Sequence, residues 1–189
     1  MAGEKFSSVQ EKVIDRYSLQ EVPDFVQKDI EDIKSPIMKF TEAFDISVKK
    51  IEFSDKSSTY VVYIRPVYRI DRKLKTDYVL LVDEVKGAEA GYSIIDHNHA
   101  PGCDFPHVGN IETYPEIDTT EGRESLRRRG LALRRYRTMN KVCKEAFGQE
   151  LHSGELNNES EAVWKRLVDL GEAAKQDVGE DDYGAFKFI

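Results

Sequence analysis

Four stretches rich in β-branched and aromatic residues constrain the fold of this chain most strongly. They are Val48–Phe53, Tyr60–Tyr68 (YVVYIRPVY), Tyr78–Val85 (YVLLVDEV) and Ala90–Ile95 (AGYSII). Residues of these types with a period of two are typical of β-strands. Lys86-Gly87 separates the last two stretches and fits the two-residue turn of a β-hairpin. We therefore expect antiparallel strands in the middle of the chain.

Helical periodicity lies on both sides of these strands. The predicted helices are Asp24–Phe44, interrupted near Ser35-Pro36, then Leu131–Phe147 and Glu159–Leu170. Gly148 and Gly171 follow the last two and fit C-terminal stops. Shorter strands are predicted at Ile111–Ile117, Glu150–Ser153 and Ala185–Ile189. Pro115 within the first of these indicates an edge or a bulge. The fold class expected is mixed α/β (α+β), with one mostly antiparallel sheet flanked by helices.

Composition excludes several classes of protein. The chain has 189 residues and only two cysteines, which favours one domain in a reducing, cytoplasmic compartment without a disulfide framework. No apolar run approaches the roughly 20 residues that span a bilayer. The charged N-terminus has no apolar core like that of a secretory signal. We expect no membrane partner.

Positive charge is concentrated in one stretch, Arg123–Arg137 (RESLRRRGLALRRYR), which has seven arginines and one glutamate. The whole chain carries −7 and this stretch carries +6, so the remainder carries −13. Three interpretations remain open: an anion site, a solvated helix start, or a grip on a nucleic acid backbone. The last needs further basic surface, which an acidic protein offers little of.

The start of the predicted helix at Leu131 suits a phosphate ligand. The first amides of a helix have no intrahelical partner, and the helix dipole adds positive charge there. Gly130 allows close approach to the backbone, Ala132 is small, and the three arginines before them can donate charge-assisted hydrogen bonds. This junction is therefore a candidate diphosphate cradle.

The same junction resembles the acetyl-coenzyme A signature of the GNAT-type N-acetyltransferase superfamily, Arg/Gln-x-x-Gly-x-Gly/Ala, with Arg127, Gly130 and Ala132 in its defined positions. The following order of helix, short strand, helix and strand is also similar. The run HSGELNNESEAVWKRLVDLGEA resembles the segment in which such proteins place a helix ending Leu-Tyr-x-x-x-Gly-Phe, and viral members, including phage-encoded ones, often have a Trp there. The resemblance covers residues 47–189, which we predict to be an acyl-CoA-binding domain. Residues 1–46 are predicted to be a helical segment that packs on or extends it.

The resemblance implies direct attack of an amine on the thioester of acetyl-CoA, which is a co-substrate. It implies that the backbone of Ile117 binds the pantetheine arm, beside a bulge, and that Asn157 or Asn158 lies near the cofactor. Glu112 and Glu116 are the candidate bases, expected on one strand face. The residues implied to hold the pyrophosphate are Arg127, Arg128, Arg129, Gly130, Leu131 and Ala132.

One position departs from the family pattern. The tyrosine that usually protonates the leaving thiolate aligns with Trp164, whose indole is no general acid at neutral pH. Tyr183 or Tyr136 is the candidate replacement. The acceptor is expected to be a small-molecule amine or a protein. The alternative function is a catalytically inactive GNAT-like protein that binds a macromolecule, such as a protein partner, through its acidic surface.

A histidine-rich loop is the remaining feature of note. Its potential metal ligands are His97, His99, Cys103 and His107. Their spacing matches no common structural zinc motif, and exposed or hydrogen-bonded histidines in a polar loop explain the pattern equally well. No metal site is predicted.

Overall fold

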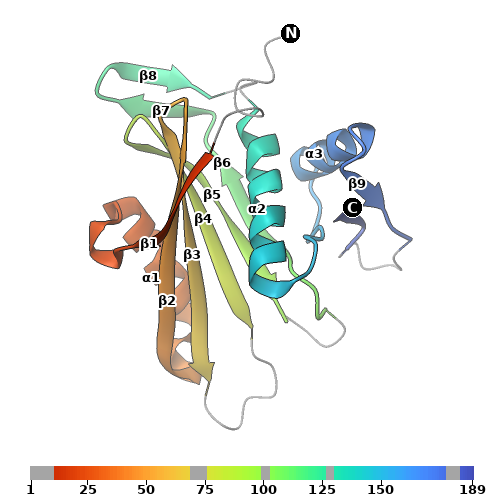
Figure 1. Ribbon diagram of the computed structural model, residues 1–189, viewed down its shortest axis with the longest axis horizontal. Helices are drawn as coiled ribbons and strands as arrows, with labels where there is room; N and C mark the ends of the chain where they lie inside the picture. The colour runs from red at the N-terminus through yellow and green to blue at the C-terminus, as the bar shows by residue number, and fades with distance from the viewer. Residues whose placement is uncertain (1–10, 69–75, 99–102, 127–129, 178–183) are drawn as a thin grey trace.

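One antiparallel sheet organises the protein. The computed structural model describes residues 11–68, 76–98, 103–126, 130–177 and 184–189. Six strands pair in chain order, β1-β2-β3-β4-β5-β6 (Figure 1). Their bounds are Glu11–Tyr17 (β1), Thr41–Phe53 (β2), Ser57–Tyr68 (β3), Asp77–Val85 (β4), Ala88–His97 (β5) and His107–Thr113 (β6). The prediction of a mixed fold around an antiparallel sheet is confirmed.

Helices cover the sheet on both faces. Helix α1 (Asp24–Ile37) lies against one face, and α2 (Leu131–Phe147) and α3 (Asn158–Asp169) lie on the other side (Figure 1). Both faces of the central strands are therefore buried, which explains runs such as YVVYI that leave few positions for polar side chains. Short 3₁₀ turns at Leu19–Glu21 and Met38–Phe40 flank α1. None of the helices in the described ranges is long and apolar enough to cross a bilayer.

Each sheet face has its own core. On the α1 face, Val26, Ile30 and Ile33 pack against side chains such as Tyr60, Val62 and Leu80. On the other face, residues including Val61, Val79 and Leu81 pack against α2, α3 and the C-terminal strands. A third cluster joins Ile117, Leu126 and Leu131 to the end of the β4–β5 hairpin.

Two small hairpin-like units complete the architecture. Strands β7 (Glu116–Thr119) and β8 (Gly122–Ser125) pair with each other between β6 and α2, and β9 (Ala173–Lys175) pairs with β10 (Phe186–Phe188). His152 forms two isolated bridges, a parallel one with His107 of β6 and an antiparallel one with Lys187 of β10. The segment around His152 therefore joins the two sheets edge to edge.

Several boundary predictions are confirmed. Helix α2 has the predicted bounds, and Gly148 caps it with φ 68°. The β4–β5 turn is at Lys86-Gly87, where both residues have positive φ.

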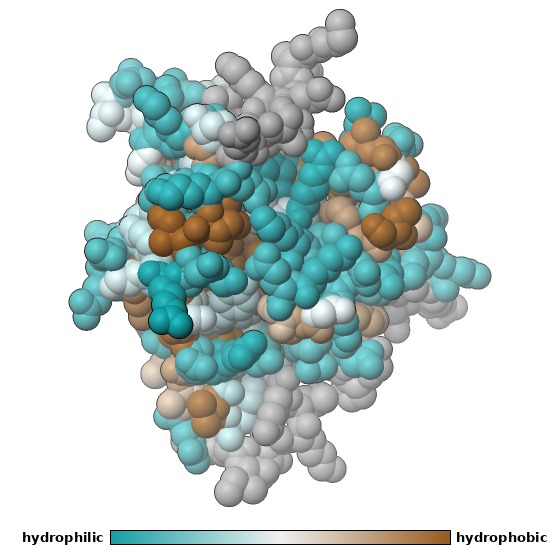
Figure 2. Space-filling model, viewed as in Figure 1, coloured by the Kyte–Doolittle hydropathy of each residue, from teal (hydrophilic) through white to brown (hydrophobic). Residues whose placement is uncertain are grey.

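The apolar side chains seen in Figure 2 form separate patches divided by hydrophilic ones, so the face in view has no continuous apolar surface.

Other predictions of secondary structure are wrong. The helix predicted to reach Phe44 ends at Ile37, one residue after Pro36, whose nitrogen has no hydrogen to donate to an inner helical turn. Residues 41–44 belong to β2, where Phe44 pairs with Pro66 of β3. Part of the N-terminal segment predicted to be helical is strand β1, which pairs with β2. The boundary predicted at residue 47 lies inside β2. Ile111–Ile117 is not one strand, because β6 ends at Thr113 and β7 begins at Glu116.

Candidate functional site

A narrow hollow opens where β6 meets the segment around His152. The Val108 N–H donates to the His152 carbonyl at 3.2 Å, and the His152 N–H donates to the Pro106 carbonyl at 2.9 Å. Gly154 permits this approach, since a Cβ there would overlap the Val108 carbonyl. Beyond it lies a cavity of about 290 Å³ between residues 108–111 and 154–157, with Tyr136 and Trp164 also in its wall. We name this cavity the arm cleft.

A bulge in β6 lies at the mouth of the arm cleft. Val108 pairs with Ile95 and Asn110 pairs with Ile94, so Gly109 is an extra residue in the ladder. Gly109 and Asn110 are both exposed. The Asn110 side chain accepts a hydrogen bond from the Ile111 N–H at 2.8 Å and donates to the Tyr92 hydroxyl at 3.2 Å. A bulge leaves backbone groups outside the regular ladder, where a ligand can reach them.

A second, larger hollow lies on the α1 side of the same bulge. Its volume is about 500 Å³, and Gly109 and Asn110 line it as they line the arm cleft. We name it the acidic pocket, because its carboxylates outnumber its one lysine, Lys28. The carboxylates are Asp29, Asp32, Asp96 and Glu112. Its other lining residues include Ile33, Ile37, Leu80, Ile94, Tyr78, Tyr92 and Tyr114. The two hollows therefore share one piece of strand β6.

Burial and neighbouring carboxylates both disfavour the ionised form of Asp29. Burial, followed by the nearby Glu89 carboxylate, raises the pKa of Asp29 to about 6. Lys28 opposes this shift, and Asp32 and Glu112 add to it. Oδ2 of Asp29 is buried and has no hydrogen-bond partner among the described residues. An ionised, unpartnered carboxylate oxygen in such a place is stabilised by a bound cation.

Tyrosine hydroxyls belong to the same network. Tyr114 donates to Glu89 at 2.8 Å, and burial together with this hydrogen bond raises the pKa of Tyr114. Burial and the neighbouring Glu112 raise the pKa of Tyr92. Both tyrosines are therefore neutral donors at physiological pH, and their ring faces attract ammonium groups.

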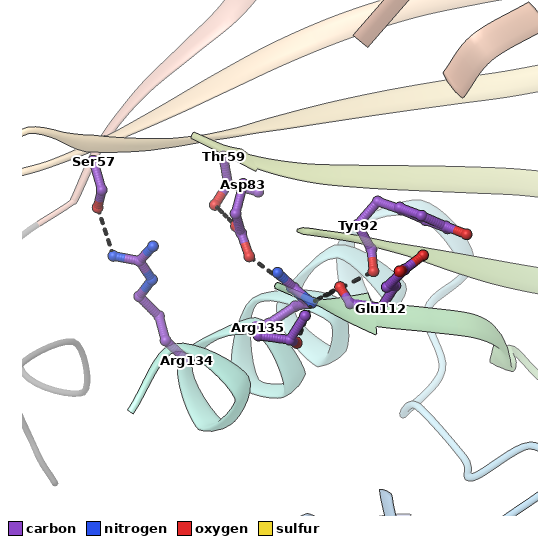
Figure 3. A network of polar contacts seen from close by, with 8 residues as sticks. Ser57, Thr59, Asp83, Tyr92, Glu112, Arg134 and Arg135 are labelled. Atoms are coloured by element: carbon purple, nitrogen blue, oxygen red, sulfur yellow. Dashed lines mark hydrogen bonds and ion pairs between the residues drawn. The ribbon is translucent and has the colours of Figure 1, made fainter. Parts of the chain in front are cut away.

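Arg135 holds the end of β6 next to the acidic pocket (Figure 3). Its Nε donates to Asp83 Oδ2 at 2.6 Å, and its Nη1 donates to the Glu112 carbonyl at 2.6 Å and to Thr113 Oγ1 at 2.8 Å. Thr59 donates to the other oxygen of Asp83 at 2.5 Å. A Cβ at Gly91 would overlap the Glu112 carbonyl and lie 2.8 Å from Arg135 Nη2. Gly91 therefore makes room for this clamp.

Two arginines of the arginine-rich stretch, Arg134 and Arg135, are buried. Arg134 donates to Ser57 Oγ at 2.7 Å and stacks over the Phe53 ring, and burial lowers its pKa. Arg137 makes two hydrogen bonds to Glu172. Exposed Arg123 pairs with acidic side chains of the β7–β8 hairpin. Among the described arginines of this stretch, Arg134 and Arg135 are therefore buried, while Arg123 and Arg137 are paired with carboxylates. Arg127, Arg128 and Arg129 lie outside the described residues.

The predicted cradle is described only from Gly130 onward. Gly130 precedes α2 with φ 78°, a left-handed conformation that favours glycine. Leu131 is buried and Ala132 is half-buried. Ile117, predicted to contact the pantetheine arm, is buried with Leu126 and Leu131, and it pairs with Glu124 in the β7–β8 hairpin. The exposed bulge that adjoins a cavity is at Gly109, not at Pro115.

The structure separates the two candidate bases. Glu112 lines the acidic pocket, whereas exposed Glu116 pairs with Arg123 at 3.4 Å on β7. The two carboxylates do not share a strand face. Asn157 lines the arm cleft and caps α3 by accepting from the Ser160 N–H at 2.8 Å, while Asn158 is the exposed first residue of α3.

Of the candidate proton donors, only Tyr136 is described, and Tyr183 lies outside the described residues. Trp164 is buried in the core, edge-on to Tyr136 with ring centroids 5.3 Å apart. The Tyr136 hydroxyl is buried without a hydrogen-bond partner in the described part of the chain, and burial raises its pKa. Tyr136 is also a lining residue of the arm cleft.

The histidine-rich loop does not assemble a metal site in the described ranges, where no group of three potential ligands converges. His97 stacks on Phe147, with ring centroids 4.2 Å apart. His107 is buried beside His152, whose pKa burial lowers to about 4. Half-buried Cys103 is a free thiol. His99 lies outside the described residues.

Sequence reasoning missed several residues of this site. Asp29 and Asp32 are one helical turn apart on α1, a spacing visible in the sequence but also common on solvated helix faces. Gly109 in the run HVGNIET signalled a bulge inside a strand. Nothing local signalled that Arg135 meets Asp83, which is 52 positions away in the chain.

No protein-family model, no curated protein and no solved structure matches the chain.

Proposed function

We propose that this protein transfers an acyl group from acyl-coenzyme A to an amine. The observation that carries the proposal is that two hollows of different character meet at Gly109-Asn110 on β6. A reaction between an extended thioester and a cationic amine needs such a meeting point, because both reactants must reach one place from different sides.

The arm cleft suits the pantetheine arm. The cleft lies between a strand edge and a diverging segment, so an extended chain with amide groups can lie there as a pseudo-strand. The start of α2 at Gly130, with the three arginines before it, suits the diphosphate, in line with the resemblance of this junction to the GNAT signature. Asn157 and Ser160 supply polar groups at the cleft wall.

The acidic pocket suits the amine. In the proposed reaction the amine nitrogen attacks the thioester carbonyl carbon, a C–N bond forms, and the C–S bond breaks. Glu112 lies on β6 two residues from the meeting point and takes the proton that the ammonium group loses. Tyr136 gives its hydroxyl proton to the leaving thiolate, the general-acid role that Trp164 cannot fill, and the second proton of the attacking nitrogen replaces it on the Tyr136 oxygen. Arg135 fixes the Glu112 backbone and so positions that base.

The test of the proposal is binding of acetyl-CoA to the full chain. Acetyl-CoA and coenzyme A are each expected to raise the melting temperature, and ATP at matched ionic strength is not. At 100 times the dissociation constant, the ligand adds about 2.7 kcal/mol. Release of free thiol in the presence of a panel of amines then tests turnover. No shift with either coenzyme would contradict the proposal.

A matched pair of variants locates the diphosphate. Gly130→Glu and Gly130→Gln both place a side chain at the left-handed position, so the backbone strain is the same in both. Only the glutamate adds negative charge at the start of α2. Gly130→Glu is expected to lose coenzyme affinity relative to Gly130→Gln. Equal affinities in the two variants would contradict a diphosphate at this helix start.

A further inference from the structure

We infer that the amine acceptor carries at least two positive charges, as an aliphatic diamine or polyamine does, and that its distal ammonium group binds Asp29 and Asp32 of α1. This inference rests on the proposed function and specifies its acceptor. It starts from the carboxylates of the acidic pocket, which are more numerous than the single base that the reaction requires. A single amine needs one carboxylate for its proton, and Glu112 on β6 supplies it.

The surplus carboxylates come from other elements than the meeting point. Asp29 and Asp32 come from α1, which packs on the sheet face opposite α2, whereas Glu112 comes from the edge strand β6. Residues three apart on a helix share a face, so the two aspartates project to the same side of α1. Asp96 of β5 adds a fourth carboxylate to the lining. Lys28 is the only basic side chain among the lining residues.

The buried oxygen of Asp29 is an independent sign of a cation site. Asp29 Oδ2 is shielded from solvent and lacks a hydrogen-bond partner in the described ranges, although its residue lines the hollow. Buried carboxylate oxygens are normally paired. Neighbouring Tyr114 already donates its hydroxyl proton to Glu89, so it does not satisfy Asp29. An ammonium group, with three N–H donors, fits this need.

Part of the wall of the acidic pocket is apolar. Ile33 and Ile37 face the pocket from α1, and Leu80 and Ile94 face it from the sheet. Aliphatic side chains suit methylene groups, and Tyr78, Tyr92 and Tyr114 add aromatic rings that attract ammonium groups. Charged ends with an aliphatic middle are the pattern of a diamine. A sugar with many hydroxyl groups would leave those hydroxyls facing isoleucine and leucine.

The first experiment needs no variant and no coenzyme. Isothermal titration of the full chain compares 1-aminobutane, 1,4-diaminobutane and spermidine at matched ionic strength. The diamine and spermidine are expected to bind at least about tenfold tighter than the monoamine, since a second ammonium group pairs with the half-buried carboxylate of Asp29. Equal affinity for 1-aminobutane and 1,4-diaminobutane would overturn the inference.

Variants on α1 locate the distal ammonium group. Asp29→Asn combined with Asp32→Asn is expected to abolish the preference for the diamine. Glu31→Gln removes the same type of charge from the same helix, but Glu31 pairs with Lys34 outside the pocket and the preference should remain. A preference that survives in the double variant would also overturn the inference. The melting temperature of each variant shows that it is folded.

Kinetics separate this inference from the proposed function. Acylation of 1-aminobutane and 1,4-diaminobutane with equal kcat/KM would contradict the inference and support acyl transfer. Tight binding of diamines without release of coenzyme A thiol would contradict the acyl transfer and support the pocket as a polyamine site.

Discussion

Arg135 and Asp83 form a fully buried ion pair, with Nε and Oδ2 2.6 Å apart and side-chain exposures of 0% and 1%. The pair joins α2 to β4, and the same guanidinium reaches the Glu112 carbonyl on β6. One side chain therefore ties the helix that begins at the candidate diphosphate cradle to the strand that carries the candidate base.

Removing one member of this pair is expected to be costly. Arg135→Ala or Asp83→Ala leaves an unpaired buried charge, and each should lower the free energy of unfolding by about 3–5 kcal/mol. The double variant should lose less than the sum of the two, since it leaves neither charge behind. Urea denaturation of the four proteins measures this. Additive losses would contradict direct coupling of Arg135 to Asp83.

Tyr136→Phe is expected to separate catalysis from stability. The hydroxyl has no partner in the described residues, so its removal should leave the melting temperature unchanged or slightly higher. If the hydroxyl donates to the leaving sulfur, kcat should fall about 100-fold or more with little change in KM. Tyr60→Phe is the matched control, because Tyr60 donates to Glu84 on the sheet and touches neither hollow. Unchanged kcat in Tyr136→Phe would remove Tyr136 from the mechanism.

Asp29→Asn is expected to stabilise the protein while weakening amine binding. Folding raises the pKa of Asp29 from 3.8 to about 6, so the ionised form is disfavoured in the folded state. The stability linked to Asp29 is fully present below pH 3.8 and is lost as the pH rises through about 6. The variant should therefore melt at a higher temperature than the wild type at pH 7.5. The difference should shrink as the pH falls toward 4. A variant less stable than the wild type at pH 7.5 would contradict this.

Binding of a diamine should release a proton near pH 6. A cation beside Asp29 favours the ionised carboxylate, so the pKa of Asp29 falls when the ligand binds. Titration of 1,4-diaminobutane at pH 6 in two buffers of different ionisation enthalpy measures the proton count. Net release in the wild type and its loss in Asp29→Asn are expected. Equal heats in both buffers for the wild type would place the ammonium group elsewhere.

Sequence periodicity predicted best those elements whose determining features lie close together in the sequence. Helix α2 has one buried stripe and a left-handed glycine after its last turn, and both features can be read within 18 residues. The β4–β5 hairpin is similar, since Lys86-Gly87 sets its register. Helix α1 was extended too far because Phe40 and Phe44 continue the helical spacing. Pairing with β3 determined the conformation of that segment, and the pairing is not visible in a local window.

The candidate site was predicted only in part for the same reason. The spacing of Glu112 and Glu116 predicts one strand face, but the break between Thr113 and Glu116 puts Glu112 on β6 and Glu116 on β7. Arginine-rich sequence indicates charge but not burial. Arg134 and Arg135 face inward because Ser57 and Asp83, on distant strands, accept their hydrogen bonds. The acidic pocket needs α1 and β6 together, which only the tertiary fold provides.

The strand order of the sheet also has a consequence for how the protein folds. Strands β1 to β6 pair in chain order, so most ladders join neighbours in sequence and can form with little loop-closure entropy. The bridge between His107 and His152, in contrast, joins residues that are separated in sequence by the β7–β8 hairpin and all of α2. We therefore expect the sheet of β1 to β6 to form early and the segment around His152 to dock onto it last. The arm cleft, which lies between the two, would then be the last part of the molecule to form. In hydrogen exchange, amides around His152 should open without global unfolding while those of β3 and β4 stay protected.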